Sequence, residues 1–144
     1  MSIRRAVPAD LPAVADLVER AFAPYVERIG RRPAPMDDDY GAHIARGDAF
    51  VGGEGAIDGL VVCVTEPGGL HVLCLAIEPA RQGAGLGRAL MAHAEAVARE
   101  RGLPEVRVYT NAAMTESLAF YPRLGYREVD RRVEDGYSRV YFKK

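Results

Sequence analysis

The order of patterns in residues 70–88 most constrains the fold: an apolar strand runs into a glycine-rich loop and then into a helix. Leu70 to Ile77 has one polar residue, a histidine, which is typical of a central strand covered on both faces. Arg81 to Arg88 contains three glycines within five residues. Glycines let the backbone approach a ligand, and a helix N-terminus adds free N–H groups and a positive dipole end. The segment therefore predicts a pyrophosphate site.

Other interpretations of this loop are less consistent with its residues. A Walker A loop needs Gly-Lys-Ser/Thr at the helix start, whereas this chain has Gly87-Arg88-Ala89. A dinucleotide fingerprint needs G-x-G-x-x-G near the first strand, whereas this spacing is G-x-G-x-G and comes late in the chain. A glycine-rich turn that only packs a helix closely on a strand remains the competing structural interpretation.

Length and charge limit the classes of function. The 144 residues suffice for one domain, 1–144, and 49% hydrophobic with 27% charged residues is typical of a globular protein. A formal net charge of −1 gives no basic excess for nucleic acid. The longest apolar run, residues 70–77, is too short to span a membrane, and residues 1–30 have no signal-peptide pattern. We therefore expect a cytoplasmic protein with no nucleic-acid or membrane partner.

Cysteine and histidine usage indicates neither a disulfide scaffold nor a metal site. The 2 cysteines, Cys63 and Cys74, both lie in apolar runs, which predicts buried, reduced thiols on neighbouring strands that could face each other. The three histidines, His43, His71 and His93, have no metal-ligand spacing with carboxylates. The sequence therefore predicts no metal.

Periodicity and turn residues predict a layered α/β domain with a sheet of mixed direction. Pro24 is expected to interrupt the first helix, and an aspartate of Asp37 to Asp39 to cap the second. Asp135-Gly136 predicts the turn of the last hairpin. The expected strands are 2–5, 49–53, 57–65, 70–77, 106–109, 126–133 and 137–142, and the expected helices are 8–23, 37–46, 86–101 and 112–124.

The loop and its flanks resemble the acetyl-CoA-binding motif of the GNAT superfamily of N-acetyltransferases. The resemblance begins with Leu75-Ala76-Ile77-Glu78-Pro79 and continues with Arg81-Gln82-x-x-Gly85-x-Gly87. Asn111 follows the next strand, and residues 119–126, Ala-Phe-Tyr-Pro-Arg-Leu-Gly-Tyr, are similar to the family's helix-to-strand segment. The order of elements also fits the family, so the resemblance covers essentially the whole chain.

This resemblance implies a fold and an activity. The fold is a single-domain GNAT fold with a mixed, mostly antiparallel central sheet of about seven strands, flanked by about four helices. The sheet is expected to splay in a V between strands 4 and 5. The implied activity is transfer of an acetyl group from acetyl-CoA, the co-substrate, to a primary amine by direct attack in a ternary complex.

The resemblance also implies which residues bind the cofactor. The strand residues before the loop would pair their backbone with the pantetheine arm, and the loop N–H groups would hold the pyrophosphate. A backbone N–H in the splay would polarise the thioester carbonyl. The implied set is Leu75, Ala76, Ile77, Arg81, Gln82, Gly83, Ala84, Gly85, Leu86, Gly87, Arg88, Asn111 and Tyr121. For Asn111, a plain turn residue that ends the strand is the competing interpretation.

The two catalytic candidates are Tyr121 and His71. Tyr121 matches the family's tyrosine that protonates the departing thiolate, and a phenol has the necessary proton. Packing beside Phe120 is the structural alternative. His71 occupies a position where some members place a glutamate base, and an imidazole can serve as a base at neutral pH. A water chain without a dedicated base is equally consistent with the sequence.

The acceptor is expected to be a small-molecule or peptide amine, bound by the first two helices, their connecting loop and the last hairpin. Asp37 to Asp39 would attract a cationic amine, whereas Arg28, Arg31 and Arg32 would favour an acidic acceptor. These clues oppose each other, so the sequence names no substrate. Two further hypotheses stay open: a homodimer, and an acetyl-CoA-binding sensor without turnover.

Overall fold

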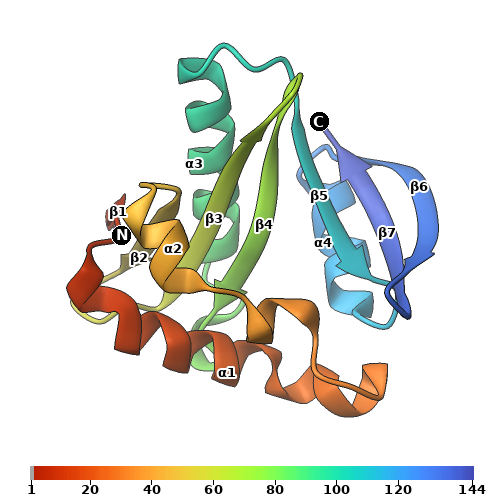
Figure 1. Cartoon of the computed structure of the whole chain (residues 1–144), viewed down its shortest axis with the longest axis horizontal. Coiled ribbons are helices and arrows are strands. Elements are labelled where there is room, and N and C mark those ends of the chain that lie inside the picture. Colours follow the sequence, from red (N-terminus) through yellow and green to blue (C-terminus); the bar gives the residue numbers. More distant parts are fainter. Residues whose placement is uncertain (1) are drawn as a thin grey trace.

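The computed structural model describes residues 2–144, and its elements follow the predicted order (Figure 1). The strands are β1 (Ser2–Arg5), β2 (Ala49–Gly53), β3 (Gly59–Glu66), β4 (Gly69–Ile77), β5 (Val106–Asn111), β6 (Arg127–Glu134) and β7 (Tyr137–Lys143). The helices are α1 (Leu11–Ile29), α2 (Tyr40–Ala45), α3 (Leu86–Glu100) and α4 (Thr115–Arg123). Short 3-10 turns cover Pro8–Asp10, Ala34–Asp37 and Pro79–Arg81. Within the described chain, no helix combines the length and apolar character that a membrane crossing requires.

The seven strands form one sheet in the order β1-β2-β3-β4-β5-β7-β6. Every neighbouring pair is antiparallel except β4 and β5, which run parallel. A parallel pair needs a crossover, and α3 provides it between these two strands. The mixed, mostly antiparallel sheet predicted from the sequence is confirmed.

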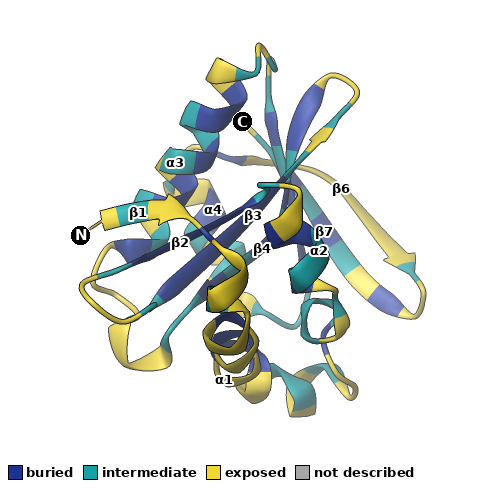
Figure 2. Ribbon diagram, turned by 60° about the vertical axis from the view of Figure 1, so that its left-hand side comes forward, coloured by how far each residue is buried: buried dark blue, intermediate teal, exposed yellow. Residues whose placement is uncertain are grey.

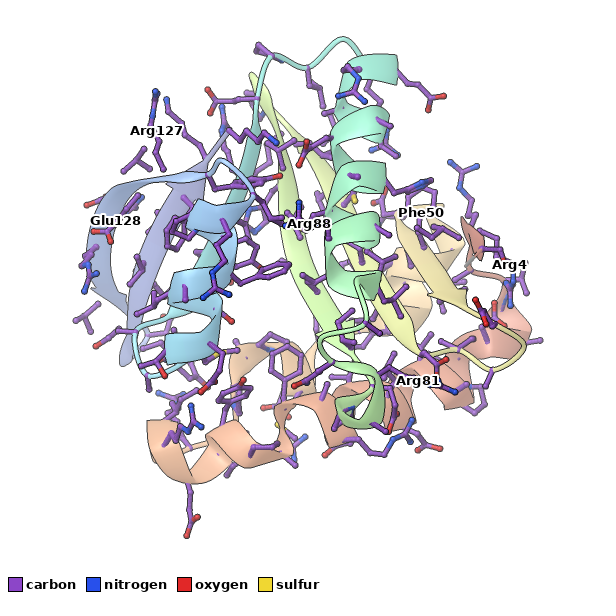
Figure 3. All side chains as sticks on the ribbon, turned by 180° about the vertical axis from the view of Figure 1, so that it is seen from behind. Arg4, Phe50, Arg81, Arg88, Arg127 and Glu128 are labelled. Carbon is purple, nitrogen blue, oxygen red and sulfur yellow. The ribbon has the colours of Figure 1, made fainter. Side chains whose placement is uncertain are left out.

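Two helical layers cover the sheet. In Figure 3, α3 and α4 lie in front of the sheet, and α1 lies behind it. Leu86, Leu90 and Met91 of α3 belong to the core on one face, whereas Val14 and Leu17 of α1 belong to the core on the other. The strands β2, β3 and β4 are therefore mostly buried, while the edge strand β6 is exposed along most of its length (Figure 2).

One residue in β4 interrupts the regular ladder with β3. Val72 is opposite Cys63 and Cys74 is opposite Val62, so Leu73 is an extra residue, a β-bulge. Bulges bend a strand and often terminate its pairing. The apolar run of β4 consequently serves both cores: Val72 lies in the α3-side core, whereas Cys74 lies in the α1-side core.

Two local signals in the sequence act as predicted. The Asp39 carboxylate accepts a hydrogen bond from the Ala42 N–H at 3.0 Å and caps α2. Asp135 and Gly136 have φ angles of 51° and 81°, which suits the two central positions of a tight hairpin turn. These residues fix the direction of the chain at α2 and between β6 and β7.

The first helix differs from its prediction, because α1 continues through Pro24 to Ile29. Pro24 is exposed and removes one main-chain hydrogen bond. The turns after it are held from outside the helix: the Tyr25 hydroxyl and the Arg28 guanidinium both donate to the Glu116 carboxylate of α4 at 2.8 Å. Contact with α4 thus maintains the helix beyond the proline.

The cysteines are buried free thiols, but the expectation that they face each other is wrong. Cys63 lies in the α3-side core and Cys74 in the α1-side core, on opposite faces of the sheet. The register explains this, because neither cysteine is opposite the other in the β3–β4 ladder.

Candidate active site

The sheet opens between β4 and β5. Leu70, His71 and Val72 of β4 pair with β5, and the last of these pairs is Val72 with Val108. Beyond it, β4 continues through Ile77 beside β3 alone, and β5 continues through Asn111 beside β7 alone. The V-shaped splay expected between the fourth and fifth strands is therefore present, and it begins at the Leu73 bulge.

The open edge of β4 presents unpaired backbone groups. The Glu78 N–H donates to the Asp58 carbonyl at 2.7 Å, so Glu78 directs its backbone toward β3. Because strand residues alternate in direction, Ile77 and Leu75 direct their N–H and C=O groups into the splay, whereas Ala76 directs its groups toward β3. Leu75 and Ile77 can therefore pair with an extended ligand.

The glycine-rich loop presents a cluster of free amides at the end of β4. Gly85 is the N-cap of α3 with a φ of 90°, a left-handed conformation that favours glycine. Within residues 2–144, the N–H groups of Gly85, Leu86, Gly87 and Arg88 have no backbone or side-chain acceptor. Four adjacent donors at a helix N-terminus form a site for an anion.

Arginines lie on both sides of this loop. Arg88 projects from the first turn of α3 on the side of α4, and Arg81 lies at the other side of the loop (Figure 3). Arg81 is 3.7 Å from the Asp58 carboxylate, whereas Arg88 has no ion-pair partner in the described part of the chain. Gln82 turns back and donates to the Ile77 carbonyl at 3.5 Å. Arg88 is therefore more available than Arg81 to a bound phosphate.

A groove of about 470 Å³ joins the open edge of β4 to this loop and runs between α3 and α4. Gly87 forms part of its floor, and a Cβ there would lie 3.3 Å from the Phe120 ring of α4. Ala84 and Leu86 do not line it, so their expected contribution rests on backbone groups. Its walls are Ala21, Phe22, Tyr25, Leu75, Ala76, Ile77, Arg81, Gln82, Gly83, Gly85, Gly87, Arg88, Met114, Glu116, Ser117, Phe120, Tyr121, Arg123 and Leu124.

A second, smaller cavity of about 70 Å³ lies at the same splay, nearer β7. Its walls include the loop between α1 and α2 and the last hairpin, which are the elements expected to bind the acceptor. The lining residues are Phe22, Ile29, Pro33, Ala34, Pro35, Val72, Leu73, Cys74, Leu75, Val108, Tyr109, Thr110, Asn111, Met114, Ser117, Tyr121, Tyr137 and Arg139.

Tyr121 lines both the groove and the second cavity. Its ring packs against Phe120, Tyr126 and Phe142, with centroids 5.2 to 5.9 Å away. Its hydroxyl has no hydrogen-bond partner among residues 2–144 and is therefore free to bond a ligand. Burial raises the pKa of the phenol above its ordinary value of 10, so the group keeps its proton at neutral pH.

Asn111 and His71 differ in their position relative to the second cavity. The Asn111 Oδ1 accepts from the Ala113 N–H at 2.9 Å, and the residue lines the second cavity rather than the groove. His71 lines neither, but its ring stacks on Tyr109, which does line the second cavity, at 5.3 Å. Burial lowers the pKa of His71; the Glu66 carboxylate opposes this shift, and the Arg107 and Arg139 guanidinium groups reinforce it.

Sequence reasoning missed several lining residues. Ser117 and Phe120 of α4 and Leu124, the residue that caps this helix, follow one another at helical spacing, so the pattern that found the helix could have found them. Arg139 and Tyr109 gave no such signal, because only the pairing of β5 with β7 brings them together.

The fold and this site define an α/β domain of the acetyltransferase class. Residues 12–126 match the sequence model of the Acetyltransferase (GNAT) family. The chain belongs to this family.

Curated relatives are similar over part of their length. The chain is 32% identical over 128 residues to mycothiol acetyltransferase from Clavibacter sepedonicus, which covers 84% of this chain and 40% of the relative. A mycothiol acetyltransferase from Salinispora tropica is 41% identical over 57 residues, or 39% of this chain and 19% of the relative. The chain therefore spans less than half the length of these proteins.

Solved structures share the fold over nearly the whole chain. The PaiA N-acetyltransferase from Thermoplasma acidophilum, in complex with coenzyme A, has a TM-score of 0.82 at 16% identity and matches 99% of this chain and 97% of its own. The ribosomal-protein-S18-alanine N-acetyltransferase from Escherichia coli has a TM-score of 0.75 at 21% identity, with 99% and 91% coverage. At these identities the likeness shows a common fold.

Proposed function

We propose that this domain transfers the acetyl group of acetyl-CoA to a primary amine by direct attack in a ternary complex. One observation carries the proposal: the groove and the second cavity meet at a common wall that includes Leu75 and Tyr121. A cofactor in the groove and an amine in the cavity would thus contact each other without leaving the protein.

The residues present fit acetyl-CoA, whose thioester supplies an activated acyl group. The free amides from Gly85 to Arg88 suit the pyrophosphate, and the Arg88 guanidinium adds a positive charge beside them. The backbone of Leu75 and the N–H of Ile77 have no partner strand and suit the amides of the pantetheine arm, whereas the Ile77 carbonyl already accepts from Gln82. A thioester bound at the splay would lie beside the irregular backbone of the Leu73 bulge, where an N–H would polarise its carbonyl.

Tyr121 is the proposed general acid. Its hydroxyl keeps its proton at neutral pH, has no internal partner, and lies at the wall between the groove and the cavity. It would donate that proton to the departing sulfur. A buried phenol is held in place by its ring contacts, so the donor stays oriented.

His71 is the proposed base, with a water chain as the alternative. The lowered pKa of His71 keeps the imidazole neutral and able to accept a proton at pH 7. Since His71 lies behind Tyr109, water would have to relay the proton from the amine. A pH–rate profile of His71→Ala separates the two: loss of the acidic limb assigns the base to His71, and an unchanged limb assigns it to water.

The primary test combines cofactor binding with thiol release. Acetyl-CoA should raise the melting temperature, because a ligand of the native state stabilises it. Thiol release should then appear with at least one member of an amine panel that includes the acceptor of mycothiol acetyltransferase. Failure of acetyl-CoA to stabilise the protein would refute the cofactor assignment. Stabilisation by acetyl-CoA without transfer to any amine would refute the proposed acetyltransferase activity and favour an acetyl-CoA sensor.

A further inference from the structure

The charge inside the second cavity is unusual for a site that receives an amine. Of its lining residues, Arg139 alone carries a charged side chain, and the lining includes no carboxylate. A site built to hold an ammonium group would be expected to offer a carboxylate to it. The cavity instead offers a guanidinium, whose side chain is only 14% exposed.

The three aspartates between α1 and α2 each have a partner within that segment or α2. Asp37 pairs with Arg32, Asp38 with His43, and Asp39 caps α2. None of these three aspartates lines the second cavity. Arg139 is therefore the charge that an acceptor in the cavity would meet.

Arg139 is held in place but not fully neutralised. Its guanidinium lies over the Tyr109 ring at 4.5 Å, which orients it. Among the residues that the structure describes, its one carboxylate contact is Glu134 at 3.5 Å, and Glu134 also accepts from the Tyr141 hydroxyl and lies 3.7 Å from Arg132. A guanidinium has five N–H donors, so most of those on Arg139 remain available.

Asn111 supplies a second donor beside Arg139. The two residues are opposite each other in the β5–β7 ladder, so their side chains share one face of the sheet, and both line the cavity. The Asn111 Oδ1 is occupied by the Ala113 N–H, which leaves its Nδ2 group to donate. The pair offers neighbouring donors, on one face of the sheet, to an anionic group in the cavity.

We infer that the acceptor is a small amine that carries an anionic group, and that Arg139, with Asn111, binds this group. The inference rests on the proposed function, because it assigns this cavity to the acceptor. Carboxylate, phosphonate and sulfonate groups share the required chemistry. The anion would anchor the acceptor at β7 while its amine faces the wall formed by Leu75 and Tyr121.

A matched set of acceptors tests the inference: 2-aminobutyrate, 2-aminobutyramide, propylamine and 1-aminopropylphosphonate. The wild-type protein should acetylate an anionic member with kcat/KM about 10- to 100-fold above the amide, as expected for a charge-assisted hydrogen bond. The carboxylate and phosphonate members distinguish between the possible anions. Equal kcat/KM for all four compounds would overturn the inference.

Variants separate binding of the anion from a structural role of Arg139. In Arg139→Gln the preference for the anionic acceptor should fall to about one, and Arg139→Lys should restore part of it because the charge remains. Arg127→Gln is the matched control, since Arg127 is exposed on the outer strand β6 and lines neither cavity (Figure 3). Persistence of the preference in Arg139→Gln would contradict the assignment, whatever the melting temperature.

A binding measurement keeps this test independent of turnover. Butyrate and butyramide, which carry no amine, are titrated by calorimetry into the CoA-saturated protein and its Arg139→Gln variant. Butyrate should bind only to the wild type, and butyramide should bind weakly to both. If no amine is acetylated, the proposed function fails while this arm still supports the anion site. If amines are acetylated but butyrate does not bind, the anion site is refuted while the proposed function stands.

Discussion

Val72 pairs with Val108 at the last position where β4 and β5 lie side by side, and the next residue of β4 is the bulged Leu73. The end of strand pairing and the irregularity in the ladder thus coincide. The groove and the second cavity both open at this point, so the site depends on where these two strands separate.

Gly87→Ala should weaken acetyl-CoA binding by roughly tenfold, or about 1.4 kcal/mol, without lowering stability. The new Cβ would lie 3.3 Å from the Phe120 ring and push it into the groove, while alanine favours the helix. Calorimetry and thermal unfolding measure the two effects. Gly102→Ala is the control with the opposite expected result. The φ of Gly102 is 68°, so alanine there should lower stability, and the residue follows the far end of α3, so CoA binding should be unchanged. Equal affinities for wild type and Gly87→Ala would disprove the close approach.

Arg88→Gln should raise the Kd for CoA several-fold but leave the Kd for pantetheine, which lacks the pyrophosphate, near its wild-type value. Arg88 lines the groove with no internal ion pair, so its charge acts on the ligand. Titrations at low and high salt should show a smaller salt dependence for the variant. Arg99→Gln, at the other end of the same helix, should behave as wild type. An equal loss for CoA and pantetheine would point to general damage instead.

Tyr121→Phe should lower kcat by about 100-fold or more, in the range expected for loss of a general acid. The ring contacts persist and the hydroxyl has no internal partner, so stability should hold. Because burial raises the pKa of this phenol, its ionisation should not reduce wild-type kcat below about pH 10. Tyr126→Phe, which loses a 2.9 Å hydrogen bond to Glu95, should lose stability but keep kcat. An undiminished kcat in Tyr121→Phe would assign the residue to packing.

His71→Gln should make the protein less sensitive to acid. The pKa of His71 is lower in the folded chain than its ordinary 6.5, so the unfolded chain binds more protons as the pH falls. The free energy of unfolding should therefore decrease as the pH drops below about 6.5, and the variant should lack that part of the decrease. Urea titrations at several pH values measure it. His93→Gln, whose histidine also has a lowered pKa, serves as the comparison. Superimposable pH profiles for wild type and His71→Gln would contradict the expected shift.

The sequence predicted the parts of the fold that depend on neighbours along the chain. The apolar alternation of β4, the amides after Gly85, the cap at Asp39 and the turn at Asp135 are all local, and each is present. The prediction that Pro24 ends the first helix was wrong, because the hydrogen bond that the proline removes is compensated by contacts to Glu116, which is distant in sequence. Local signals cannot report such compensation.

The candidate site likewise has a part that local sequence predicts and a part that depends on contacts between distant residues. The cofactor groove was predictable because one continuous segment, residues 75–88, forms much of it. The second cavity was predictable only in part: the loop between α1 and α2 and the last hairpin were expected to bind the acceptor, whereas the walls from β4, β5 and α4 depend on the packing of the sheet. Arg139 became informative only once the register placed it opposite Asn111. A charge on a strand indicates little until its neighbours across the sheet are known.

The bulge at Leu73 also bears on how this fold could lose its chemistry. Without Leu73, Val72 and Cys74 would be consecutive opposite Cys63 and Val62, and the β3–β4 ladder would be regular. Every other residue of β4 would keep its present face, so both cores could still form. We expect a protein with Leu73 deleted to fold but neither to bind acetyl-CoA nor to acetylate amines, as circular dichroism and calorimetry would show. The extra residue would then be dispensable for the architecture but essential for the proposed reaction, so a single-codon deletion would leave the fold intact without that activity.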